Sequence, residues 1–126
     1  MGDRERPLRY DAWVPDYLDR IREFALAIDG AREEFSFGED SPVYKAANGK
    51  IFAISGRDGA STRVSLKLSP DEVLEALTLP FVDHAPYLSK THWVATRISN
   101  EAELEVTFAW MTRSHELVTA KPARKR

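Results

Sequence analysis

Hydrophobic residues recur at two different periods along this chain, and the change of period separates helices from strands. Spacings of three and four residues predict a first helix over residues 14–29, which ends at Asp29-Gly30 because glycine accepts positive φ. From residue 34 to residue 68 the period becomes two, which predicts strands at 35–37, 43–46, 51–54 and 62–68. Asn48-Gly49 predicts a tight hairpin turn between the second and third of these strands.

Two more helices are predicted from their capping residues. Ser69 and Glu72 form a capping box around Pro70, and the helix that follows ends before Pro80, with Val73, Leu74 and Leu77 expected to face inward. Residues 81–89 are rich in turn formers, and residues 92–98 predict another strand. Asn100 caps a last helix, whose apolar stripe comprises Leu104, Phe108, Met111, His115 and Val118.

The predicted element order is α-β-β-β-β-α-β-α. Strands outnumber crossover helices, so the sequence predicts a two-layer α+β fold, with a curved antiparallel sheet and helices packed on it. A chain of 126 residues is expected to fold as one domain. We place that domain at residues 11–119, between a flexible leader at 1–10 and a basic flexible tail at 120–126.

Composition narrows the possible chemistry. The chain has no cysteine, which excludes disulfides, thiolate metal sites and a cysteine nucleophile. Neither a signal peptide nor a membrane span is visible, so a cytoplasmic location and no membrane partner are expected. The formal net charge is −2, and a role in nucleic-acid binding would therefore require a local basic patch.

Five motifs occur in order along the chain: EFSFG at 34–38, VYK followed by GKIFA at 43–53, RVSLK at 63–67, YLSKTHW at 87–93 and SHELVTAK at 114–121. In this combination the chain resembles the MmcQ/YjbR family from about residue 16 to residue 122. One departure is His115, where the family usually has tyrosine. The resemblance implies a compact double-wing domain and a DNA-binding role, although a fold alone does not establish a function.

A candidate binding surface follows from the strand at 62–68. Alternation places Arg63, Ser65 and Lys67 on one face, opposite Val64 and Leu66. If the strand at 92–98 lies beside it, cations for phosphate and rings for stacking would share one surface. The candidate residues are Arg63, Lys67, Tyr87, Lys90, His92, Trp93 and Arg97. The alternative is that the cations are solvated strand residues and that Trp93 belongs to the core.

Other chemistry has less support in the sequence. His92 could titrate near neutral pH, but a histidine holding a fixed hydrogen bond is the simpler interpretation. Asp83 and His84 could supply two metal ligands, yet the spacing places no third ligand. The acidic residues Glu33, Glu34, Glu39 and Asp40 have no helical spacing and are expected on a solvated turn and a strand edge. We therefore expect no catalytic residues, no metal and no cofactor.

Three classes of function remain. The first is a non-enzymatic DNA-binding module that uses the local basic face. The second is a domain that binds a protein or a small anionic ligand, with residues 87–93 lining a pocket. The third, an enzyme, has no nucleophile motif to support it. A monomer or weak dimer is expected in each case.

Overall fold

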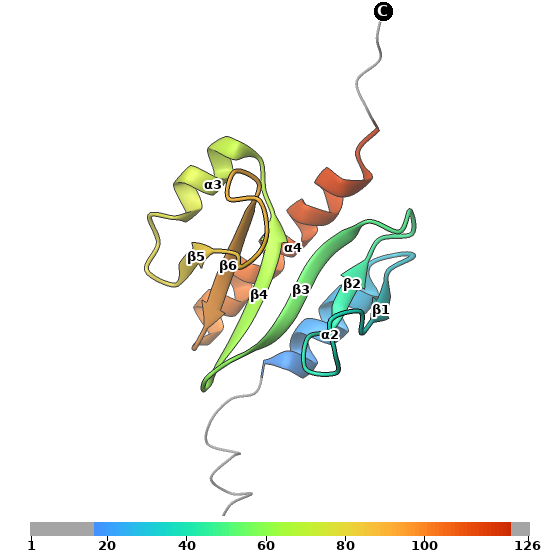
Figure 1. Ribbon diagram of the computed structural model, residues 1–126, viewed down its shortest axis with the longest axis horizontal. Helices are drawn as coiled ribbons and strands as arrows, with labels where there is room; N and C mark the ends of the chain where they lie inside the picture. Colours follow the sequence, from blue (N-terminus) through green and yellow to red (C-terminus); the bar gives the residue numbers. More distant parts are fainter. Residues whose placement is uncertain (1–16, 122–126) are drawn as a thin grey trace, which may run out of the picture.

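The computed structural model describes residues 17–121, and these residues form a two-layer α+β fold (Figure 1). Its helices are α2 (Leu18–Ala27), α3 (Pro70–Ala76) and α4 (Glu101–Thr119). Its strands are β1 (Arg32–Glu34), β2 (Val43–Lys45), β3 (Ile51–Asp58), β4 (Ser61–Lys67), β5 (Val82–His84) and β6 (Trp93–Ile98). The strand order is β1-β2-β3-β4-β6-β5, with every neighbouring pair antiparallel, so the predicted fold class is confirmed. The predicted leader, the predicted helix start at residue 14 and most of the tail lie outside the described residues.

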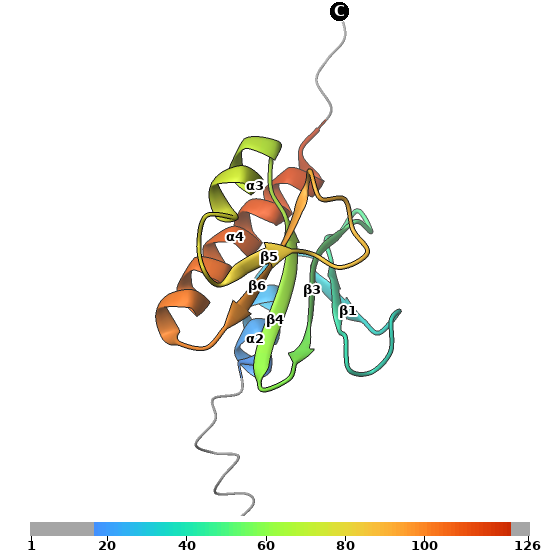
Figure 2. The same cartoon turned by 60° about the vertical axis from the view of Figure 1, so that its left-hand side comes forward.

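The helices pack against one face of the sheet, as Figure 2 shows most clearly. The core between the layers is built from the predicted stripes, with Ile21 of α2, Leu66 of β4 and Met111 of α4 completely buried. Phe24 of α2 stacks on Phe108 of α4, with 4.3 Å between the ring centroids, and this contact joins the two helices. Within residues 17–121, no helix is long and apolar enough to cross a membrane.

Both predicted helix caps are present. The Ser69 side chain accepts a hydrogen bond from the Glu72 amide, and the Glu72 carboxylate accepts one from the Ser69 amide. Asn100 accepts a hydrogen bond from the Glu103 amide at 2.9 Å. These side chains satisfy amide groups that the first turn of a helix leaves unpaired, so the local sequence determines where α3 and α4 begin.

Four predictions about individual elements are wrong. The strand predicted at 51–54 continues to Asp58 in β3, because its pairing with β4 extends through Gly56 and Arg57. The first strand covers residues 32–34, whereas 35–37 belongs to a turn in which the Gly38 amide bonds to the Phe35 carbonyl. The short strand β5 lies inside the stretch that the sequence analysis interpreted as turns. It was missed because three residues give too little alternation to identify a strand. Leu74 of α3 is 69% exposed, and Ala76 faces the core beside the correctly predicted Val73.

A hydroxyl group from α4 ends the ladder between β3 and β4. The last pair in register is Ala53 with Leu66, so the next pair would be Phe52 with Lys67. Instead, the buried Ser114 hydroxyl accepts a hydrogen bond from the Lys67 amide at 2.9 Å and donates one to the Phe52 carbonyl at 2.7 Å. Helix and sheet are therefore joined by hydrogen bonds as well as by apolar packing.

His115 occupies the position expected from the sequence. Its ring is half-buried and meets the Phe52 ring edge-on, with 5.1 Å between the centroids. An aromatic pair in this arrangement is favourable because the edge of one ring faces the electron-rich face of the other. The interpretation of His115 as a ring at the edge of the core is confirmed.

Candidate functional site

One face of the sheet is not covered by any described helix, and we call it the open face. Its residues come from β3, β4 and β6: Ile54, Gly56, Arg63, Ser65, Lys67, Trp93, Ala95 and Arg97. The loops at 35–42 and 85–92 lie on this side, away from α3 and α4 (Figure 2). They partly cover the face, and Ser65 and Ala95 are buried although they point away from the helices.

The register between β4 and β6 brings the predicted site residues together. Arg63 lies directly opposite Arg97, and Lys67 lies directly opposite Trp93. Residues opposite each other in an antiparallel pair point to the same side of the sheet, with β-carbons about 5 Å apart. The expectation that the strand at 92–98 lies beside the strand at 62–68 is therefore confirmed.

Two carboxylates stand among these cations. Asp58, at the end of β3, lies 3.7 Å from Nη1 of Arg63 and 3.4 Å from Nε of Arg97. Asp83 of β5 also forms an ion pair with Arg97. The carboxylates offset the repulsion between two arginines held side by side, and they reduce the positive charge at this end of the open face.

The other end of the face keeps its positive charge. Within residues 17–121, neither Lys67 nor Lys90 has a carboxylate within ion-pair distance. The His92 carbonyl accepts a hydrogen bond from the Leu68 amide at 2.9 Å, which ties the loop carrying Lys90 to the end of β4. Lys67 and Lys90 therefore lie at the same end of the open face, and no described carboxylate neutralises them.

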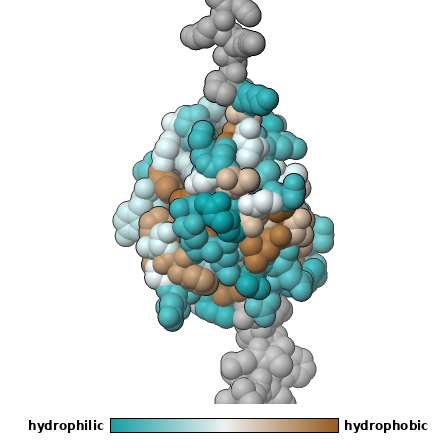
Figure 3. Space-filling model, turned by 90° about the vertical axis from the view of Figure 1, so that its right-hand side faces the viewer, coloured by the Kyte–Doolittle hydropathy of each residue, from teal (hydrophilic) through white to brown (hydrophobic). Residues whose placement is uncertain are grey.

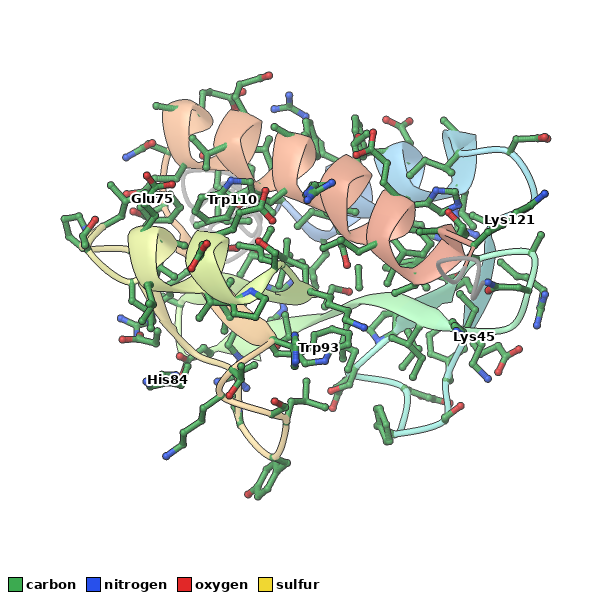
Figure 4. The ribbon with its side chains drawn as sticks, turned by 90° about the horizontal axis from the view of Figure 1, so that it is seen from above. Lys45, Glu75, His84, Trp93, Trp110 and Lys121 are labelled. Carbon is green, nitrogen blue, oxygen red and sulfur yellow. The ribbon has the colours of Figure 1, made fainter. Side chains whose placement is uncertain are left out.

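Trp93 is half-buried and lies on the open face, so its side chain does not belong to the core between sheet and helices. Figure 4 shows Trp93 on the far side of the sheet from α4, whereas Trp110 lies between α3 and α4. A half-buried ring beside a lysine can stack with a ligand on its free side.

A pocket of about 420 Å³ opens between the two loops. Its floor includes Ile54 and Gly56 of β3 and Arg63 of β4, and Phe37 and Tyr87 stand on the loops that form its walls. A β-carbon placed on Gly56 would lie 3.3 Å from the Asp40 carbonyl oxygen, so the absence of a side chain here lets the 35–42 loop lie close to β3. Pockets of this size fit small ligands or single side chains.

The two acidic candidates on β1, Glu33 and Glu34, have structural partners. Glu33 accepts hydrogen bonds from Arg22 and from the Tyr44 hydroxyl, and burial together with this carboxylate raises the pKa of Tyr44. Glu34 pairs with Lys45, whose hydrogen bond lowers the pKa of the Glu34 carboxyl group. Within residues 17–121, no three metal-ligating side chains gather at one place.

Comparison with known protein families identifies the family of this chain. The sequence model of the YjbR family matches residues 26–117, which is most of the chain. The chain belongs to the YjbR family. A comparison with the curated proteins finds no match.

Two solved structures are similar to this YjbR chain. A Deinococcus radiodurans protein, DR2400, with a DUF419 domain, has 24% sequence identity and a TM-score of 0.72, with 86% of this chain and 82% of that chain covered. A Pseudomonas syringae protein has 17% identity and a TM-score of 0.65, with 79% of this chain and 97% of that chain covered. At these identities the likeness shows the fold alone.

The structure of this YjbR domain also identifies residues that the sequence analysis missed. Phe37 and Ile54 line the pocket beside the predicted Arg63 and Tyr87, and Asp58 pairs with both open-face arginines. Phe37 could have been identified as exposed from the sequence if Gly38, the residue after it, had been interpreted as a turn signal. Nothing in the sequence places Asp58 beside Arg97, because that contact depends on the strand order.

Proposed function

We propose that this YjbR domain is a non-enzymatic nucleic-acid-binding module whose binding surface is the open face. The observation that carries the proposal is the register that sets Lys67 opposite Trp93, with Lys90 on the adjoining loop. Lysines that no described carboxylate neutralises can contact phosphates, and the ring beside them can stack on a base. The net charge of −2 makes this local arrangement necessary, since the chain as a whole does not attract phosphate.

The test is a salt-dependent titration of labelled DNA, single-stranded and duplex, by fluorescence anisotropy. At about 50 mM salt, where electrostatic binding is strong, we expect a dissociation constant in the micromolar range. Lys67→Glu/Lys90→Glu should abolish measurable binding. The matched control is Lys50→Glu/Lys121→Glu. It makes the same change of charge at two exposed positions, one in the turn before β3 and one after α4, which are not part of the open face.

The two double variants separate local from overall charge. Binding lost in the first and retained in the second supports the open face as the binding surface. Equal losses in both would mean that overall charge alone sets the affinity. If the wild-type protein shows no binding at tens of micromolar, the nucleic-acid proposal is wrong.

A small anionic ligand or a protein segment is the second candidate, and the pocket beside Arg63 favours it. Asp58 and Asp83 both pair with Arg97, which lowers the positive charge offered to a long phosphate backbone, whereas Arg63 at the pocket can still contact a compact anion. Binding of a small anion that is lost in Arg63→Ala, without any DNA binding, would favour this second function.

A further inference from the structure

The walls of the pocket carry two exposed rings. Phe37 is 61% exposed at the tip of the 35–42 loop, and Tyr87 is fully exposed on the 85–92 loop. Neither ring contributes to the core, so packing within the protein does not explain why aromatic residues stand at these two positions. Exposed rings on opposite walls of a pocket offer stacking surfaces to a flat ligand.

The backbone at Tyr87 adds an independent observation. Its φ is 64°, and among the described residues it is the non-glycine residue with positive φ. A side chain with a β-carbon disfavours this left-handed conformation, and such strain concentrates at ligand-binding positions. The strained backbone holds the Tyr87 side chain at the pocket, where glycine would have been the residue of lowest strain.

The charged residues that line the pocket indicate which chemical group a flat ligand would carry in addition to its ring. Arg63 lines it, and no carboxylate from the described residues does. The contact between Arg63 and Asp58 is 3.7 Å long, which is beyond hydrogen-bond distance, so it does not use up the guanidinium N–H groups. Lys67 stands four residues beyond Arg63 on the same face of β4, with Ser65 between them. A ligand that stacks on the rings and reaches Arg63 would combine a planar ring with an anionic group, which is the chemistry of a nucleotide.

We infer that the pocket between Phe37 and Tyr87 is a binding site for one unpaired nucleobase, with the phosphate of that nucleotide held by Arg63. This inference rests on the proposed nucleic-acid-binding function and specifies single-stranded nucleic acid as the ligand. A base inside a duplex is stacked on both sides and paired, so it cannot enter a pocket of this size. The domain therefore prefers single-stranded over duplex nucleic acid.

The test uses Tyr87→Ala and Phe37→Ala, with Phe35→Ala as the matched control. Phe35 is 50% exposed at the start of the same loop but does not line the pocket, so the control removes an equivalent ring elsewhere. The probes are a labelled oligothymidylate of about ten nucleotides, the same strand in a duplex, and thymidine monophosphate. The first two are measured by anisotropy, and the third by chemical-shift changes in the amide NMR spectrum.

We expect the wild type to bind the single strand more tightly than the duplex. Each pocket variant should weaken single-strand binding by about 5- to 150-fold, the range measured for the loss of one stacking ring, while the dependence on salt stays the same. Phe35→Ala should bind as the wild type does. Thymidine monophosphate should shift the amide signals of residues 37, 56 and 87 in the wild type.

The outcomes separate this inference from the proposed function. Equal affinity for single strand and duplex, or pocket variants that behave like Phe35→Ala while Lys67→Glu/Lys90→Glu loses binding, would keep the basic surface and overturn the base pocket. Thymidine monophosphate binding that requires Tyr87, without oligonucleotide binding, would support the pocket and overturn the nucleic-acid function. If neither probe binds, both are overturned.

Discussion

Replacing Ser114 by alanine tests whether one buried hydroxyl group joins α4 to the sheet. The hydroxyl is completely buried, and it bonds to the Lys67 amide at 2.9 Å and to the Phe52 carbonyl at 2.7 Å. Alanine removes a single oxygen atom and leaves two buried backbone groups without a partner. The change is small in volume, so the expected loss comes from hydrogen bonding more than from a cavity.

The magnitude follows from the two groups left unpaired. Each buried donor or acceptor without a partner costs about 1–3 kcal/mol. Partial relaxation of the strand ends lowers the sum, and we expect Ser114→Ala to reduce the free energy of unfolding by about 2–4 kcal/mol. This is a large part of the roughly 5–15 kcal/mol that holds a domain of this size together.

The assay is urea unfolding followed by circular dichroism, with Thr112→Ala as control. Thr112 is exposed on the same helix, and its replacement should change the free energy of unfolding by less than about 0.5 kcal/mol. Hydrogen exchange adds a local measurement, because the Lys67 amide should lose protection in Ser114→Ala while the Leu66 amide, in the regular ladder, should keep it. A loss of stability below about 0.5 kcal/mol, or unchanged exchange at Lys67, would refute the reasoning.

Two further perturbations have outcomes that the structure predicts. Asn48→Ala removes the hydrogen bond from the hairpin to the Val118 carbonyl at the end of α4 and should cost about 1 kcal/mol in urea unfolding, unlike Lys50→Ala. The Ser69 amide and Arg113 lower the pKa of Glu72 below 4.5, so the stability it provides is present above that pH and is lost as the pH falls further. Glu72→Gln should therefore lose less stability than the wild type between about pH 7 and pH 3, and an identical loss would contradict this assignment.

The sequence predicts the faces of the strands better than it predicts their neighbours. Alternation alone placed Val64 and Leu66 in the core and Arg63 and Lys67 on the opposite side, because consecutive side chains of a strand point in opposite directions. Capping residues fixed the starts of α3 and α4 for a similarly local reason. Pairing partners depend on contacts between distant segments, so Asp58 beside Arg97 could not be predicted.

The turn at 35–38 shows how a local pattern can mislead. Phe35, Ser36 and Phe37 alternate as a strand would, yet both rings are exposed and the chain turns at Gly38. Alternation records which residues are apolar and does not record whether a core is available to bury them. Figure 3 views the side of the molecule that carries β1 and β2, and its hydrophobic areas are separated by hydrophilic ones.

Sequence motifs that lie far apart meet at one end of β4. The Ser114 hydroxyl from SHELV holds the Lys67 amide of RVSLK, and Lys67 lies opposite Trp93 of YLSKTHW. The helix side of this connection is buried and serves stability, while the open side carries the lysine and the ring. The motifs that the chain shares with the family therefore contain both residues that stabilise the fold and candidate binding residues. Only substitutions on the open side, such as Lys67→Glu, separate the two, because they leave the buried hydrogen bonds in place.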